Sequence, residues 1–77
     1  MNISVYPNPV KDNLVIHNFS ETAVLKLYDL GGRLVKQHFI WANTTQEIPV
    51  SDLKNGLYLL KIQNEKGVMI KKIVIEK

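Results

Sequence analysis

The chain has 77 residues and no cysteine, so we predict one small domain that neither disulfides nor thiolate metal sites can stabilise. Its core must come from the 45% of residues that are hydrophobic. The formal net charge is +3, but nine of the ten basic residues are lysines, which we interpret as solvating strand faces and guarding sheet edges rather than binding nucleic acid.

The first third of the chain predicts three short strands separated by turns. Residues 3–6 alternate apolar and polar, and they end at the Pro-Asn-Pro sequence of residues 7–9, where two prolines remove backbone donors. Residues 14–17 and residues 23–29 show the same alternation, which is typical of strands with one buried face.

The middle of the chain predicts a hairpin and a short edge strand. Paired glycines in residues 29–33 permit the positive φ angles of a tight turn. Residues 33–41 predict the returning strand, and their mixed apolar parity indicates a bulge or two buried faces. Residues 43–45 predict a loop, a short strand follows around Ile48, and residues 51–56 predict a single helical turn.

The last 22 residues, 56–77, predict one β-hairpin. Two runs rich in β-branched and aromatic residues, 56–62 and 68–75, flank the loop sequence Asn-Glu-Lys-Gly at residues 64–67. The whole chain thus predicts an all-β protein, an antiparallel β-sandwich of about seven short strands. The predicted inward-facing residues are Val5, Leu14, Ile16, Leu25, Leu27, Ile48, Leu53, Tyr58, Leu60, Ile62, Ile73 and Ile75.

The chain offers little that predicts catalysis. His17 and His38 lie in separate strands without metal-ligand spacing, and we interpret both as solvent-facing. Asp12, Asp29 and Asp52 each sit beside a turn, where a short carboxylate accepts backbone hydrogen bonds. We therefore expect no enzymatic activity, no metal and no cofactor.

Three aromatic residues allow two interpretations. Tyr28, Phe39 and Trp41 would form a platform for sugar or peptide binding if they were exposed. The chain has only six aromatic residues and needs them inside, so we predict a core role.

The ends of the chain bear on where the protein acts. No apolar run approaches the roughly 18 residues of a transmembrane helix, so we expect no membrane insertion. The N-terminus lacks the basic and apolar segments of a signal peptide, and Met1 runs directly into strand-like sequence. We expect residues 1–77 to be a fragment of a larger protein with an added start codon, rather than a cytosolic miniprotein.

Four stretches, in this order, resemble a known family: residues 6–9 (Tyr-Pro-Asn-Pro), 28–35, 53–58 and 72–77. They are similar to the C-terminal sorting domain of type A cargo of the type IX (Por) secretion system in Bacteroidetes-type bacteria. The similarity covers essentially the whole chain. One departure is the pair Gly31-Gly32, where the family commonly has a polar residue before a single glycine; we expect a looser turn and unchanged recognition.

The resemblance implies an immunoglobulin-like β-sandwich that ends a larger secreted protein. It implies as partners the type IX translocon and shuttle proteins, a sortase that typically removes the domain, and an upstream cargo domain in cis. It also implies export through the periplasm and the outer membrane, to the cell surface or beyond. Self-association stays open because exposed terminal strands can swap between chains. A fibronectin-like adhesion or carbohydrate-binding module remains the alternative function.

We hypothesise that the candidate site residues fall into two groups. The candidates for translocon recognition, all in the last hairpin, are Gly56, Tyr58, Lys71, Lys72, Ile73, Val74, Ile75 and Lys77. The family-motif residues to which we assign a mainly structural role are Tyr6, Pro7, Asn8, Pro9, Asp29, Gly32 and Arg33. We expect a partner to pair with the main chain of residues 72–77 and to contact the lysine heads.

Overall fold

The computed structural model describes residues 2–77, which form seven β-strands and no helix. Met1, the first residue of the predicted domain, lies outside the described residues. The strands are β1 (Ile3–Tyr6), β2 (Asn13–Asn18), β3 (Ala23–Tyr28), β4 (Leu34–Ile40), β5 (Thr44–Pro49), β6 (Gly56–Asn64) and β7 (Gly67–Ile75). The predicted all-β class is confirmed.

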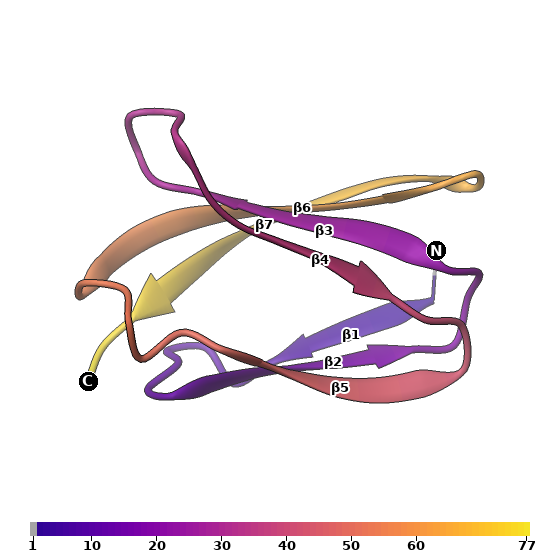
Figure 1. Ribbon diagram of the computed structural model, residues 1–77, viewed down its shortest axis with the longest axis horizontal. Coiled ribbons are helices and arrows are strands. Elements are labelled where there is room, and N and C mark those ends of the chain that lie inside the picture. Colours follow the sequence, from indigo (N-terminus) through magenta and orange to yellow (C-terminus); the bar gives the residue numbers. More distant parts are fainter. Residues whose placement is uncertain (1) are drawn as a thin grey trace.

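The strands lie in two layers, which Figure 1 shows one above the other. The smaller sheet has the order β1-β2-β5 and the larger sheet the order β4-β3-β6-β7, with every neighbouring pair antiparallel. The chain crosses between the layers after β2, β4 and β5. This is the immunoglobulin-like sandwich with its fourth strand in the larger sheet, beside β3, instead of in the sheet of β1, β2 and β5.

The core lies between the two layers because one face of nearly every strand is apolar. In β3, for example, the residues alternate between buried and half-buried along the whole strand. The predicted inward-facing residues are all buried except Leu53, which is half-buried and packs against the core. The sequence pattern missed five further buried apolar residues, namely Ile3, Val10, Ala23, Ile40 and Val50.

A bulge explains the mixed parity of β4. Leu27 pairs with Lys36 but Tyr28 pairs with Leu34, so Val35 is an extra residue in the ladder. The predicted bulge is thus confirmed.

Three aromatic residues that we predicted in the core, Tyr28, Phe39 and Trp41, are outside it. Beyond the bulge, Ile40 is fully buried, whereas its neighbours Phe39 and Trp41 are 63% and 59% exposed, and Tyr28 is half-buried. The prediction is wrong because Ile40 already fills the core position at this end of β4, and alternation turns Phe39 to solvent.

Two local predictions also fail. Residues 51–56 contain no helical turn; the Leu53 amide donates to the Val50 carbonyl at 3.0 Å, which closes a single β-turn. The turn follows Val50, whose amide donates to the Asp12 carbonyl at 2.8 Å and whose side chain is buried. The predicted loop at residues 43–45 is also too long, because β5 already begins at Thr44.

Two kinds of feature are missing from the part of the chain that the structure describes. Residues 2–77 contain no helix with the length and apolar character needed to cross a membrane. The same residues hold no group of three or more histidine, cysteine, aspartate or glutamate side chains that could bind a metal ion.

Candidate functional site

The candidate recognition residues lie on β6 and β7, the edge hairpin of the larger sheet, except Lys77, which follows β7. Strand β7 pairs with β6 along its whole length, from Gly67 opposite Asn64 to Ile75 opposite Gly56. Of the eight candidates, three are buried (Tyr58, Ile73 and Ile75), two are half-buried (Lys71 and Val74) and three are exposed (Gly56, Lys72 and Lys77). The buried candidates can therefore act only by holding the strand in place.

The side chain of Asn8 pairs with the outer edge of β7. Its Nδ2 donates to the Lys72 carbonyl at 3.2 Å, and its Oδ1 accepts from the Val74 amide at 3.0 Å. One carboxamide thus makes the two hydrogen bonds that a neighbouring strand would make. Asn8 lies between Pro7 and Pro9, and the peptide bonds before both prolines are cis.

Two residues later, the main chain itself joins the edge of β7. The Val10 amide donates to the Val74 carbonyl at 2.8 Å, and the Glu76 amide donates to the Val10 carbonyl at 2.9 Å. These bonds form an isolated parallel bridge between Val10 and Ile75. Asn8 and Val10, hereafter the clasp, therefore fix the last part of β7 from its outer side.

The lysines of the last strand differ in their surroundings. The Lys77 amide donates to Asn55 Oδ1 at 3.1 Å, and its Nζ donates to the Ser51 carbonyl at 2.5 Å. Lys71 Nζ donates to the Val5 carbonyl on β1 at 3.2 Å. For Lys72 no hydrogen bond or ion pair of the ammonium group is found within residues 2–77, and the side chain is exposed.

The clasp changes where a partner strand can pair with β7. The outward-facing main-chain groups of Val74 and the Lys72 carbonyl are already bonded. Alternate residues of a strand face the same side, so Val68 and Ile70 present their main-chain groups to the same edge, and within residues 2–77 nothing is found bonded to them there. The open part of the edge is thus at Val68 and Ile70, before the stretch that we predicted.

The other motif residues make contacts that a turn requires. Asp29 Oδ1 accepts from the amides of Gly31 and Arg33 at 2.9 and 3.0 Å, and Oδ2 lies 3.4 Å from Arg33 Nε. Gly32 has a φ of +86°, a conformation that favours glycine. Tyr6, on the outer face of the smaller sheet, hydrogen-bonds through its hydroxyl to His17 Nε2.

The fold is a small β-sandwich whose last strand, β7, is held along its outer edge by the clasp. The model of the secretion system C-terminal sorting domain family matches residues 4–76, so the chain belongs to this family. It is a C-terminal sorting signal for type IX secretion, which interacts with the type IX machinery and directs export across the outer membrane. The family is not an enzymatic one. No curated protein matches the chain.

The clasp predicts a local effect of Asn8→Ala. Val74 would lose the acceptor of its amide, so we expect the opening free energy at this amide to fall by roughly 1 kcal/mol, which corresponds to about fivefold faster hydrogen exchange. Hydrogen exchange followed by NMR measures this directly. Asn13→Ala is the control, because Asn13 is exposed and the structure gives its side chain no hydrogen bond. Unchanged exchange at Val74 in Asn8→Ala would contradict the role of the clasp.

Proposed function

We propose that the outer-membrane translocon recognises the folded domain at the edge hairpin β6–β7, and that a sortase then separates the domain from an upstream cargo. Family membership supports the first step, because a sorting signal must be bound by the secretion machinery. The single observation that carries the proposal is the clasp, since it holds the final strand in one conformation before any partner arrives. Such preorganisation lowers the entropic cost of binding.

The translocon would contact three exposed features of the hairpin at the same time. Val68 and Ile70 offer unpaired main-chain groups to an incoming strand, as in β-augmentation. Lys72 projects next to this edge and Lys77 lies beyond it, so both ammonium groups would contact carboxylates of the partner. Tyr58, Ile73 and Ile75 would contribute by keeping β7 in register on the core.

A reporter fusion tests this role of the two lysines. The reporter carries an N-terminal export signal and this domain at its C-terminus, and it is expressed in a bacterium with a working type IX system. Deleting residues 73–77 would stop export, but it also removes the buried Ile73 and Ile75 and so confounds recognition with folding. The sharper variant is Lys72→Glu with Lys77→Glu, for which we expect the reporter to accumulate in the periplasm.

The matched control for this charge reversal is Lys11→Glu with Lys54→Glu. Lys11 and Lys54 are exposed lysines outside the strands of the hairpin, and the double change gives the same net charge. Normal surface display of the hairpin variant, at wild-type stability, would rule out recognition through Lys72 and Lys77. For the sortase step, a strain without sortase activity should display the uncleaved fusion, and identical processing in both strains would refute that step.

Binding of a carbohydrate is the second candidate function, and one observation favours it. The exposed rings of Phe39 and Trp41 lie 6.1 Å apart between centroids and are inclined by 32°. Gln46 fixes the backbone below them, accepting from the Trp41 amide and donating to the Phe39 carbonyl. A saturable change in the fluorescence of Trp41 on titration with oligosaccharides would support this function, and no change across a panel would exclude it.

A further inference from the structure

The strands of the larger sheet contain lysine but no acidic residue. Strands β3, β4, β6 and β7 carry five lysines, whereas all aspartates and glutamates lie in the connections, in β5 or after β7. Two of the five are engaged: Lys36 Nζ lies 3.1 Å from Asp52 Oδ1, and its hydrogen bond lowers the pKa of that carboxyl, while Lys71 bonds to the Val5 carbonyl. The remaining three are Lys26, Lys61 and Lys72.

These three lysines lie together on the outer face of the larger sheet. Lys26 on β3 is directly opposite Lys61 on β6, and Lys72 on β7 is the diagonal neighbour of Lys61, which faces Ile70. No ion pair or hydrogen bond of their ammonium groups is found in the described part of the chain, residues 2–77. Like charges placed directly opposite each other destabilise a sheet. The fold therefore tolerates an unfavourable arrangement at the centre of this face.

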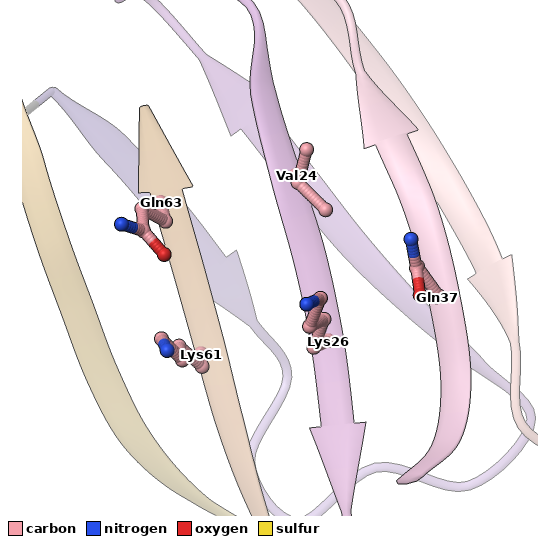
Figure 2. Close-up of a pocket in the computed structure, with 5 residues that line it drawn as sticks. All are labelled: Val24, Lys26, Gln37, Lys61 and Gln63. Carbon is pink, nitrogen blue, oxygen red and sulfur yellow. The ribbon is translucent and has the colours of Figure 1, made fainter. Parts of the chain in front are cut away.

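Amide side chains frame the lysine pair. Figure 2 shows Lys26 and Lys61 at the same level on neighbouring strands, with Gln37 beside Lys26 on β4 and Gln63 next to Lys61 along β6. With Val24 these four side chains line a depression of about 250 Å³. Two ammonium groups and two carboxamides thus line one shallow site, where the paired positive charges suit a carboxylate.

The surroundings of the depression indicate the class of ligand. Six large apolar side chains on the same outer face are exposed, namely Leu34, Phe39, Leu57, Leu59, Val68 and Ile70. A lysine cluster within an apolar surface matches a protein interface, where apolar contact supplies affinity and charge supplies orientation. Nucleic acid and other bare polyanions would favour a continuous basic surface with arginine instead.

We propose that the outer face of the larger sheet, centred on Lys26 and Lys61, is a docking surface for an acidic and partly apolar surface of a protein of the secretion machinery. The inference rests on the sorting function and adds a second contact region to it, on β3, β4 and β6. A carboxylate of the partner placed between the two ammonium groups neutralises their repulsion. Binding thus relieves an unfavourable interaction that the free domain carries.

The test is the surface display of the reporter fusion described above, with Lys26→Glu and Lys61→Glu introduced together. Like-charge contacts at a protein interface oppose binding, so we expect at least about tenfold less reporter on the cell surface and a matching increase in the periplasm. The control with Lys11→Glu and Lys54→Glu has the same net charge and should be exported normally. Protease accessibility of the reporter on intact cells measures both.

A neutral variant separates docking from folding. Lys26→Gln with Lys61→Gln removes the repulsion, so its melting temperature should equal or exceed that of the wild-type domain while export still falls. Normal export of the glutamate variant, or an equal loss in the Lys11/Lys54 control, would overturn the proposal. Failure of the wild-type fusion to be exported would instead overturn the sorting function, and the docking surface with it.

A binding measurement distinguishes a protein partner from a polyanion. The purified domain is passed over immobilised heparin and mixed with vesicles of phosphatidylcholine and phosphatidylglycerol. If the partner is a protein, the Lys26/Lys61 variant should bind heparin and the vesicles as well as the Lys11/Lys54 control does. If only the Lys26/Lys61 variant loses its binding to heparin or to the vesicles, this face binds polyanions and the proposal is contradicted.

Discussion

Asn18→Asp is expected to lower the free energy of unfolding by about 3 kcal/mol or more, a large part of the total for a domain of this size. Asn18 is the buried polar residue among residues 2–77, with a relative exposure of 0%. Its Nδ2 lies 3.0 to 3.2 Å from the carbonyls of Glu21, Ile40 and Trp41, and its Oδ1 accepts from the Ser20 amide at 2.9 Å.

The physical reason is the loss of a donor at a site lined by acceptors. A carboxylate in place of the carboxamide would face the three carbonyl oxygens without solvent and without a hydrogen to share. Glu21 and Trp41 lie in the two connections that cross between the sheets at this end of the sandwich, and Ile40 ends β4, so both crossings would loosen.

Urea unfolding followed by tryptophan fluorescence or circular dichroism measures the effect of Asn18→Asp. Asn13→Asp is the control: it makes the same chemical change on the same strand, at an exposed position. We expect the control to stay close to the wild type. Equal midpoints for Asn18→Asp and the wild type would show that Asn18 does not hold the two crossings together.

Ile73→Ala is the second substitution with a large expected effect, a loss of about 2 to 5 kcal/mol of stability. Ile73 is 1% exposed and sits opposite the buried Tyr58, so its truncation leaves a cavity under the final strand. Ile70→Ala provides a control on the same strand with the same chemistry, because Ile70 is 60% exposed. Surface substitutions of that kind usually change stability by less than about 0.5 kcal/mol.

Thermal or urea unfolding measures the stability of the Ile73→Ala and Ile70→Ala variants. A loss of stability in Ile73→Ala alone shows that this residue has a structural role in β7. The reporter fusion with Ile73→Ala should be lost from the surface because the domain no longer folds. A similar loss of stability in both variants would contradict the orientation of β7 on the core.

Alternation along the strands predicted most of the core but not its ends. Residues such as Leu25, Leu27, Leu60 and Ile62 follow a period of two, which the sequence displays directly. Val10 and Val50 close the sandwich from connections, where no period exists. Nothing local in the sequence marks such residues as buried.

In strand β4, one inserted residue interrupts the alternation of buried and exposed side chains. The mixed parity of residues 33–41 predicted the bulge, but not where it lies. Because the bulge at Val35 resets the alternation, Ile40 faces the core and Phe39 and Trp41 face solvent. The exposure of these two aromatic residues could be predicted only with the register of β4 against β3.

The assignment of recognition to the last hairpin stays a prediction, whereas the turn around Asp29 was predicted from its local chemistry. The clasp was missed because Asn8 and Lys72 are separated by most of the chain and meet only in the folded sandwich. The pairing of Lys26 with Lys61 likewise depends on the register of β3 against β6, which no single strand encodes.

The sorting function is tested most directly by the location of the wild-type reporter fusion in two strains that differ only in the type IX translocon. The domain is predicted to bring the reporter to the cell surface in the competent strain and to leave it in the periplasm of the deficient strain. The same distribution of reporter between periplasm and surface in both strains would contradict the account.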